Sequence, residues 1–450
     1  MPSSVFDSIL LRDSWSTEEM RRVFSDENRV QKWYDLEATL ASEQAALGIV
    51  PREAAGEIMR NAKVEKVDLA AIAAATLEAK HPLVPALRAL QKLCKPELGE
   101  YLHYGPTTQD VLDTGMMLQL KEAHAIVLRD LRRVGRALRA LAERYRATPM
   151  VGRTHGVQAL PITFGHKCAI WLREVSRHRE RLAQAEKRVF VGSLVGAVGT
   201  MASFGPNAID LERRVLARLG LGQADISWQP ARDRFAEYAS VLGFIAGTLT
   251  KIASEVFALQ RTEIDEIEEP FNPGKVGSST MPHKRNPSIS EAMITVGRTL
   301  RYNVAILQET LVQVHERESA IWKMEWKALP EVCLGLSFLL AQGAQVLEHL
   351  RVKPEKMRAN LDLLGGLLLS ERVMFFLAEK LGKQTAHEVV YEAAMHAQEH
   401  GEVFETVLRR DPRLADLDLK PILDPTSYAG LAPELVDRAL AETRKEGWLE

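Results

Sequence analysis

Residues 110–146, DVLDTGMMLQLKEAHAIVLRDLRRVGRALRALAERYR, decide the fold class of this 450-residue chain. The apolar positions recur at alternating steps of three and four: Leu120, Ala123, Val127, Leu131, Val134, Leu138 and Leu141. This spacing places the apolar side chains on one face of an α-helix. The stretch therefore predicts one continuous amphipathic helix, longer than most helices of globular proteins.

Four further segments carry a similar helical spacing, over residues 164–190, 234–266, 288–315 and 330–350. No stretch shows the alternation of apolar and polar residues that is typical of strands. Five long helices without strands predict an all-α protein with an antiparallel bundle at its centre. The apolar stripes are broad along their whole length, so we expect bundles to pack against bundles in an oligomer.

Shorter helical patterns stand on both sides of this bundle. Residues 1–110 are interrupted by prolines such as Pro51, Pro82, Pro96 and Pro106, and residues 352–450 by several glycines and prolines, which end helices. We therefore predict three domains: an N-terminal helical domain over 1–110, a central long-helix bundle over 111–351 and a C-terminal helical domain over 352–450.

Charge and composition argue against several classes of protein. The formal net charge is −2 and the isoelectric point is near 6.7, whereas phosphate recognition needs a concentrated basic excess. No uninterrupted apolar run reaches the length of a membrane span, and the N-terminus lacks the pattern of a secretory leader. Three scattered cysteines, Cys94, Cys168 and Cys333, suit reduced buried thiols. We expect a soluble, cytoplasmic protein that binds neither nucleic acid nor membranes.

A loop separates two of the predicted long helices, at residues 274–287, GKVGSSTMPHKRNP. Its glycines and prolines exclude a regular element, and loops of helical proteins often carry the chemistry. Ser278 and Ser279 offer hydroxyl groups that can exchange protons, while Lys284, Arg285 and Asn286 offer donors suited to carboxylates. The composition predicts an anion-binding active-site loop.

The eleven residues GSSTMPHKRNP, 277–287, resemble the signature loop of the fumarase/aspartase superfamily. Members of that superfamily perform reversible β-elimination from succinyl-type substrates. The resemblance covers nearly the whole chain and implies the three-domain fold of the superfamily and a homotetramer. In such a tetramer each active site collects loops from several subunits. It also implies a small polycarboxylate substrate, and we expect no cofactor.

A second group of residues, GRTHGVQALP at 152–161, is similar to a loop of adenylosuccinate lyases. The residues alone suggest that His155 lies at the entry of the following helix. The resemblance instead implies that His155 is the general acid that protonates the leaving group. Gln158 stands where adenylosuccinate lyases have a second histidine, and we count it as substrate-binding.

Glu291 has two interpretations. Residues 288–291, SISE, have the form of a capping box at the start of a helix, which is a structural role. In adenylosuccinate lyases, a glutamate at this offset from the signature serines pairs with the catalytic histidine. A carboxylate on one ring nitrogen fixes the tautomer and raises the pKa of the imidazole, as a general acid near neutral pH requires.

Further candidates lie in three other places. The segment Thr107, Thr108, Gln109 and Asp110 either starts a helix or, like the T-S/T-x-D segment of the superfamily, holds substrate carboxylates at a helix N-terminus. His81 matches a second active-site histidine of adenylosuccinate lyases. In the run Arg232-Asp233-Arg234, which resembles an R-D-R run of the superfamily, we expect Arg234 to contact substrate, with ion pairing to its neighbours as the alternative.

One motif that suggests a metal is rejected. His396, Glu399 and His400 have the H-x-x-E-H spacing of a zinc site, but they end at Gly401, where a histidine near a helix C-terminus is favourable without a metal. No third ligand is evident downstream. We therefore expect no metal.

Two groups of residues indicate different branches of the superfamily. Residues 315–330, 357–366 and 423–428 resemble bacterial 3-carboxy-cis,cis-muconate cycloisomerases. Those enzymes usually lack the acid and the glutamate at the positions of His155 and Glu291, which resemble adenylosuccinate lyases. The alternatives are therefore a β-eliminating lyase, a lactone-forming cycloisomerase of aromatic catabolism and a catalytically inactive, crystallin-like scaffold.

The resemblance implies a mechanism with a serine base and a histidine acid. Ser278 takes a proton from the carbon next to a carboxylate, and Ser279 is the second candidate because adjacent serines cannot be told apart. Lys284, Asn286 and the segment 107–109 hold the carboxylates and stabilise the developing charge. His155, oriented by Glu291, protonates the departing nitrogen or oxygen.

Overall fold

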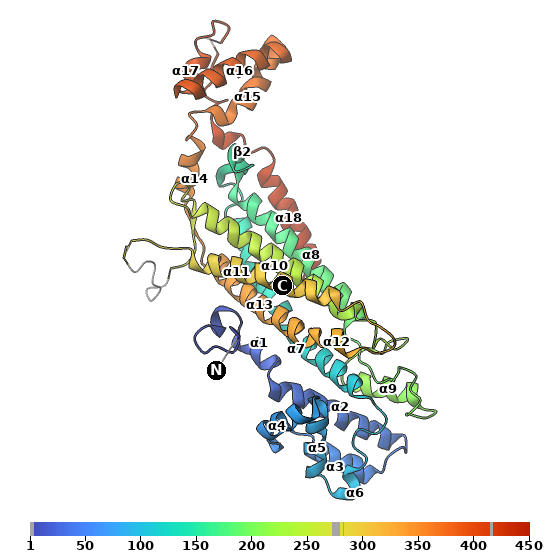
Figure 1. Ribbon diagram of the computed structural model, residues 1–450. Coiled ribbons are helices and arrows are strands. Elements are labelled where there is room, and N and C mark those ends of the chain that lie inside the picture. The colour runs from blue at the N-terminus through green and yellow to red at the C-terminus, as the bar shows by residue number, and fades with distance from the viewer. Residues whose placement is uncertain (1–3, 272–279, 282, 415–416) are drawn as a thin grey trace. The chain divides into compact units, whose positions relative to one another are not determined.

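The computed structural model describes residues 4–271, 280–281, 283–414 and 417–450. α-Helices dominate these residues, which confirms the predicted all-α class (Figure 1). The five long helices are α7 (Thr108–Arg144), α8 (Phe164–Val189), α10 (Asp233–Leu259), α11 (Ser288–Glu309) and α13 (Met324–Glu348). The 37 residues of α7 confirm the single long helix that the spacing of three and four predicts.

Shorter elements complete the chain. The other helices are α1 (Glu18–Val23), α2 (Asp26–Ala46), α3 (Arg52–Asn61), α4 (Leu69–Ala79), α5 (Leu83–Leu93), α6 (Pro96–Gly99), α9 (Ala208–Arg218), α12 (Ser319–Trp322), α14 (Pro354–Leu361), α15 (Ser370–Leu381), α16 (Lys383–His400), α17 (Phe404–Leu408) and α18 (Ala432–Glu446). Four 3-10 turns are η1 (Arg12–Ser14), η2 (Val64–Lys66), η3 (Leu367–Leu369) and η4 (Pro425–Ser427). The strands are β1 (Pro149–Thr154), β2 (Val157–Thr163), β3 (Ile267–Glu268) and β4 (Arg351–Val352).

The chain divides into two compact units. The first unit comprises Met1–Leu131, Arg177–Thr250 and Met293–Ala341, and the second comprises Arg132–Ser176, Lys251–Ala292 and Gln342–Glu450. Each of the five long helices therefore has a part in both units. The predicted division into three domains stays a prediction.

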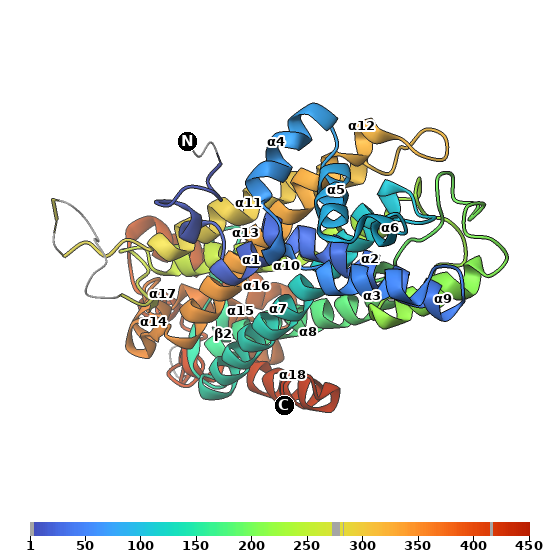
Figure 2. The same ribbon diagram turned by 90° about the horizontal axis from the view of Figure 1, so that it is seen from below.

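The first unit has a core built by its N-terminal helices, which gather in one region (Figure 2). Trp33 and Tyr34 of α2 pack with Leu83 and Leu90 of α5 and with Val111 of α7. The Tyr34 hydroxyl donates to the carbonyl of Ala86 at 2.8 Å, so the ring is buried without an unpaired polar atom. This core fixes the end of α7 at which the candidate site begins.

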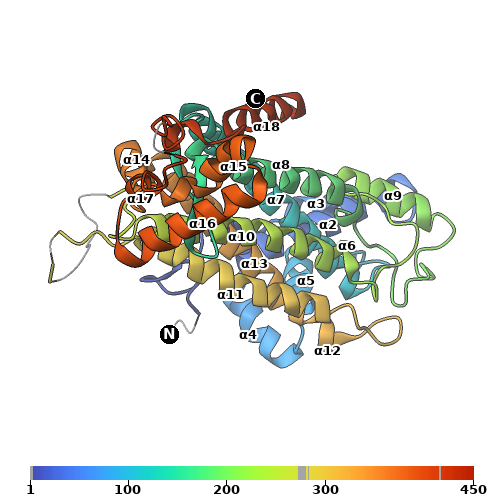
Figure 3. The ribbon, with the colours of Figure 1, turned by 90° about the horizontal axis from the view of Figure 1, so that it is seen from above.

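The second unit contains the C-terminal helices α15, α16 and α17, which lie together in Figure 3. Val373, Leu377, Val389, Phe404 and Leu408 are buried between them. The elements β1 and β2 of the same unit form an antiparallel hairpin in which Thr154 pairs with Val157. The expectation of a chain without strands was therefore wrong at this point.

Residues His155 and Gly156 form the turn of the hairpin. Their φ angles are +52° and +83°, and two successive positive φ angles are what a two-residue turn between twisted strands requires. Glycine tolerates this conformation, and histidine is among the residues that adopt it more often than most. The interpretation of His155 as a helix-entry residue was wrong, because β2 stands between His155 and α8.

Three helix ends differ from the prediction. α10 ends at Leu259 rather than at 266, because the chain continues into β3, which pairs with β4. α11 ends at Glu309, six residues before the predicted end at 315. α13 begins at Met324, so that Pro330 lies inside it. The carboxylate of Glu325, in the first turn of α13, binds Arg232, a tertiary contact that the local sequence does not reveal.

Two helical segments, Asp233–Leu259 and Ser319–Glu348, are long and apolar enough to cross a membrane by length and composition alone. Of their most apolar windows, 56% and 78% are buried inside the protein, as expected for core helices of a bundle. The cytoplasmic location stays a prediction. The three cysteines are buried and free, as predicted, and burial raises the pKa of the Cys168 and Cys333 thiols.

Candidate active site

The start of α7 is held by the carboxylate of Asp110, which is fully buried. It accepts hydrogen bonds from the backbone N–H of Thr107 at 3.0 Å and of Gly196 at 2.9 Å, and from the Ser193 hydroxyl at 2.9 Å. Burial raises the pKa of Asp110, and these donors oppose the shift. Asp110 thus positions the helix start, and a contact between its side chain and substrate stays a prediction.

Thr107 and Thr108 are half-buried beside it. The Thr107 hydroxyl accepts a hydrogen bond of 2.5 Å from Nη1 of Arg317. Gln109 is buried, and its amide donates to Asp113 and to the carbonyl of Gln229, both at 3.1 Å. Its Oε1 has no hydrogen-bond partner in the part of the chain that the structure describes. A guanidinium group, a hydroxyl group and the first turn of a long helix together suit a carboxylate.

His81 belongs to the same unit. Its Nδ1 is buried and has no hydrogen-bond partner among the described residues. Burial lowers the pKa of His81, and the positive charges of Lys323 and Arg317 lower it further, so the ring is neutral at pH 7. Arg317 thus binds Thr107 and its charge also acts on His81, and a role of His81 and Thr107 in substrate binding stays a prediction.

His103 is a buried-pair histidine near the start of α7 in sequence, and the sequence reasoning did not single it out. Its Nδ1 lies 2.7 Å from Oε1 of Glu37, and its backbone N–H donates to Oε2 of Glu37 at 3.1 Å. Burial disfavours the charged ring, but the charge of Glu37 and its hydrogen bond outweigh burial, so the pKa of His103 is raised. His103 lies four positions before Thr107 in sequence, and this proximity was the only available signal.

We expect the pH titration of His103 to depend on Glu37. In wild-type protein the ring should titrate above the ordinary value of 6.5, and the stability that the pair contributes should be present below 6.5 and lost as pH rises through the raised pKa. In Glu37→Gln, burial dominates and the midpoint should fall below 6.5. Histidine NMR resonances measure both midpoints, with His81 as the control that stays low. An unchanged His103 midpoint would refute the pairing.

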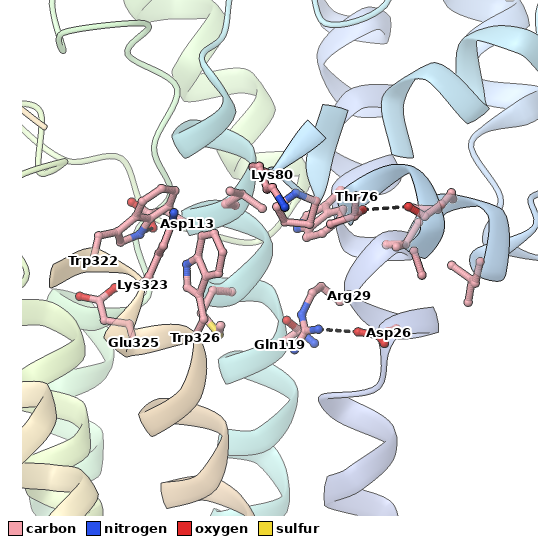
Figure 4. A pocket seen from close by; sticks show the side chains of 18 of the residues that line it. Asp26, Arg29, Thr76, Lys80, Asp113, Gln119, Trp322, Lys323, Glu325 and Trp326 are labelled. Atoms are coloured by element: carbon pink, nitrogen blue, oxygen red, sulfur yellow. Dashed lines mark hydrogen bonds and ion pairs between the residues drawn. The ribbon is translucent and has the colours of Figure 1, made fainter. Parts of the chain in front are cut away.

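A cavity of about 570 Å³ in the first unit is lined by the two sequence neighbours of His81, not by His81 itself. Its lining includes Lys80 and Pro82, the sequence neighbours of His81, and Lys323. Figure 4 shows Trp322 and Trp326 of α12 and α13 on one side and residues of α2 and α4 on the other. The volume falls in the range of small-molecule sites, and aromatic side chains with lysines at the edge suit a partly apolar, anionic ligand.

The buried wall of this cavity contains a charge cluster. Arg232 is fully buried and pairs with Asp113 at 2.8 Å and with Glu325 at 2.6 Å. Nε1 of Trp322 donates to Asp113 at 3.0 Å. Of the two arginines in the run 232–234, Arg232 is thus bound to carboxylates within the core. Arg234 is half-buried and donates to the carbonyl of Arg188; its predicted contact with substrate stays a prediction.

The second unit contains the predicted acid. His155 is exposed at the tip of the β1–β2 hairpin. The hairpin is anchored close to its tip, because Arg153 forms two hydrogen bonds to Glu266 and Gln158 donates to the carbonyl of Asn360 at 3.3 Å. Oε1 of Gln158 is buried and unbonded within the described residues. The structure therefore presents a solvent-facing imidazole on a fixed support.

The predicted loop is described only in part. Ser278 and Ser279 lie outside the described residues. Lys284 is exposed and Asn286 is half-buried near the start of α11. Glu291 is exposed in the first turn of α11, and its backbone N–H donates to the carbonyl of Pro287, which makes Pro287 the N-cap residue.

The capping-box alternative for Glu291 was therefore wrong in its cap residue, because Ser288 lies inside the helix. Glu269 supplies the cap from across the loop, where it accepts from the N–H groups of Ile289 and Ser290. The pairing of Glu291 with His155 stays a prediction.

The C-terminal histidines follow a different pattern from a metal site. The rings of His396 and His400 stack at 4.1 Å, and His396 lies 3.1 Å from Glu402. Among the described residues, no group of three His, Cys, Asp or Glu side chains is arranged to hold a metal ion.

Comparison with known proteins places the chain in a family. A family model described as "Lyase" matches residues 12–300, and one described as "Adenylosuccinate lyase C-terminus" matches residues 366–439. The chain is 49% identical to N-acetyl-S-(2-succino)cysteine lyase of Enterococcus italicus over 100% of both chains. It is 46% identical to the enzyme of the same name from Dickeya dadantii over 98% of both.

The fold is similar to that of a solved enzyme. The 3-carboxy-cis,cis-muconate lactonizing enzyme of Pseudomonas putida matches with a TM-score of 0.92 and 36% identity, over 97% of this chain and 99% of that one. The inactive-scaffold alternative is not supported, since the family models are those of lyases and the relatives reported above are named as enzymes. The chain therefore is an enzyme of the fumarase/aspartase superfamily, in the branch of adenylosuccinate lyase and 3-carboxy-cis,cis-muconate cycloisomerase.

Proposed function

We propose that this enzyme catalyses reversible β-elimination from a small succinyl-type polycarboxylate. The observation that carries the proposal is the group formed by His81, Arg317 and Thr107 at the start of α7. Arg317 binds the Thr107 hydroxyl, and the positive charges of Arg317 and Lys323 lower the pKa of His81, whose Nδ1 is unbonded among the described residues. This arrangement suits a carboxylate of the substrate.

The leaving group is a thiol in this proposal. Two relatives whose alignments span nearly the whole chain are named lyases of N-acetyl-S-(2-succino)cysteine, a succinyl thioether. The cavity lined by the neighbours of His81 supports the idea, because its tryptophans and its lysines Lys80 and Lys323 suit a leaving group that has apolar and anionic parts. The sequence alone suggested nitrogen or oxygen as the leaving atom.

The proposed reaction moves one proton off carbon and one proton onto sulfur. Ser278 takes the proton from the carbon next to a carboxylate, the electron pair forms the carbon–carbon double bond, and the carbon–sulfur bond breaks. His155, with its ring oriented by Glu291, gives its proton to the departing thiolate. The products are fumarate and a thiol. Ser279 is the second candidate for the base.

Fixed donors stabilise the charge that develops on the carboxylate during proton removal. Lys284, Asn286 and the segment Thr107 to Gln109 are the proposed donors. Gln158 and Arg234 are proposed to contact the substrate as well, and we propose no cofactor and no metal for this reaction.

A homotetramer with shared active sites is part of the proposal. His155 is exposed at a hairpin tip and Lys284 and Glu291 are exposed near the start of α11, whereas proton transfer to a leaving group is most effective in a site that excludes water. Large apolar side chains also remain exposed on α10 and α11, with Phe244 56% and Tyr302 75% exposed. Neighbouring subunits would cover both features.

The test is a panel of three substrates: a succinyl thioether of N-acetylcysteine, a succinyl adduct of an amine and 3-carboxy-cis,cis-muconate. We expect the thioether to be consumed with release of equal amounts of fumarate, followed by its ultraviolet absorbance, and of thiol, followed with a thiol reagent. Turnover of the muconate alone would refute the proposal and favour the cycloisomerase, which the likeness to the Pseudomonas putida lactonizing enzyme supports.

A further inference from the structure

One acidic segment of the second unit, Glu266–Glu269, contacts the hairpin that carries the proposed acid and the helix that follows the proposed base in sequence. Glu266 and Glu269 are 0% and 3% exposed. A buried carboxylate is costly unless charges or hydrogen bonds compensate it, so each of the two needs specific partners. The carboxylate of Glu266 binds the hairpin and α14, and the carboxylate of Glu269 binds the start of α11.

Glu266 fixes the hairpin that carries His155. Its two oxygens accept from Nη1 and Nη2 of Arg153 at 3.0 and 2.7 Å, and Oε1 also accepts from Nδ2 of Asn360 at 2.9 Å. The carbonyl of Asn360 accepts from Nε2 of Gln158 at 3.3 Å. Because Arg153 lies in β1 and Gln158 in β2, both strands are attached to one carboxylate, directly or through α14, which contacts β1.

Glu269 fixes the helix that follows the serine loop. Its carboxylate accepts from the N–H groups of Ile289 at 3.0 Å and Ser290 at 2.9 Å, and from the Ser290 hydroxyl at 2.8 Å. An N-cap side chain normally binds these amides, but Pro287 occupies that position and has no acceptor side chain. The negative charge is also favourable at the positive end of the helix dipole.

The two ends of the loop are joined beside this cap. The backbone N–H of Glu269 donates to Oε1 of Gln260 at 2.9 Å, and Nε2 of Gln260 donates to the carbonyl of Arg285 at 3.3 Å. Glu268 also binds Nη1 of Arg285 at 2.9 Å. In sequence, Ser278 lies between the two joined ends.

We propose that Glu266 and Glu269 are positioning residues with separate effects: Glu266 places the acid hairpin, and Glu269 places the start of α11, the helix that follows the serine loop in sequence. Neither residue needs to touch the substrate. Their separate hydrogen-bond partners predict separable defects, although only three positions separate them in sequence. The catalytic part of this inference rests on the proposed function, whereas the positioning part can be measured without turnover.

The first experiment measures amide hydrogen exchange by mass spectrometry in the full-length protein. Glu269→Gln should raise exchange at 288–292 and leave 149–163 unchanged, and Glu266→Gln should do the reverse. Glu446→Gln is the matched control, because Glu446 forms a two-bond pair with Arg173 in the same unit but is more exposed. It should change neither segment. If Glu266→Gln and Glu269→Gln each loosened both segments, or neither, the proposal would be overturned.

The second experiment compares turnover of two succinyl thioethers, one with an alkyl thiol and one with an aryl thiol. An aryl thiolate leaves without much help from an acid, so Glu266→Gln should lower kcat about 100-fold on the alkyl substrate and less than about 10-fold on the aryl substrate. Glu269→Gln should lower kcat by a similar factor on both, because both need the base. Equal losses on both substrates in both variants would overturn the separation.

Inactivity of the wild-type enzyme on both thioethers would count against the proposed function, not against positioning. In that case, the exchange pattern alone would decide whether Glu266 and Glu269 place separate elements.

Discussion

Replacing Ser278 with alanine should lower kcat on the succinyl thioether by about 10³-fold, the range that loss of a general base produces. KM should change little, because the proposed carboxylate contacts come from Lys284, Asn286 and the start of α7 rather than from the serine. Steady-state kinetics with fumarate detection measures both constants. A primary isotope effect on substrate deuterated at the reacting carbon should appear or increase, since proton removal then limits the rate.

The control for this variant is Ser279→Ala, which removes the same atoms from the neighbouring position. We expect it to retain most of the activity, and both variants to unfold at the wild-type temperature. If Ser279→Ala were the inactive variant, Ser279 rather than Ser278 would be the base. If both variants converted the substrate at near-normal rates, neither hydroxyl would be the base, and the proposed mechanism would be refuted.

The helices could be predicted where the pattern is local and long. In α7 the apolar repeat continues through most of the helix, and its predicted limits, 110 and 146, differ from Thr108–Arg144 by two residues at each end. The start of α13 could not be predicted in this way. Pro330 suggested a helix start. Instead, Glu325 and Trp322 bind a buried cluster around Arg232 and Asp113, and the helix begins before Pro330 for this reason.

The hairpin was missed because its signal is short. β1 and β2 have six and seven residues, too few for a clear alternation, and the turn His155-Gly156 is less typical than Asn-Gly or Asp-Gly. The resemblance predicted the candidate site residues, but it did not predict the residues that hold other groups in place, such as Glu37 and Glu269. Glu37 lies 66 positions from His103, and Glu269 lies 21 positions from Ser290. Such contacts depend on the fold and leave no local pattern.

Replacing Arg232 with methionine should destabilise the first unit by about 3–5 kcal/mol, the cost of removing one partner from a buried ion pair. Arg232 is fully buried between Asp113 and Glu325, so the variant would leave two carboxylates without their cation. Methionine keeps much of the apolar length of the side chain. Denaturant unfolding followed by tryptophan fluorescence is a suitable measurement, since Trp228 and Trp322 contact the cluster.

Arg234→Met is the matched control, because Arg234 is two residues away, is half-buried and also lies near the Trp228 ring, at 5.9 Å. Its effect on stability should stay below about 1 kcal/mol. An equal loss of stability in both variants would show that the buried charge cluster is not the cause.

The loss of stability caused by Arg232→Met should also depend on pH. In the wild type, burial already raises the pKa of Glu325 while Arg232 lowers it, so removal of Arg232 should raise that pKa further. A carboxyl group whose pKa is higher in the folded than in the unfolded state loses stability as pH rises from the unfolded value through the folded one. The deficit should therefore be smaller near pH 5 than near pH 8. A deficit independent of pH would mean that lost packing, rather than two uncompensated carboxylates, destabilises the variant.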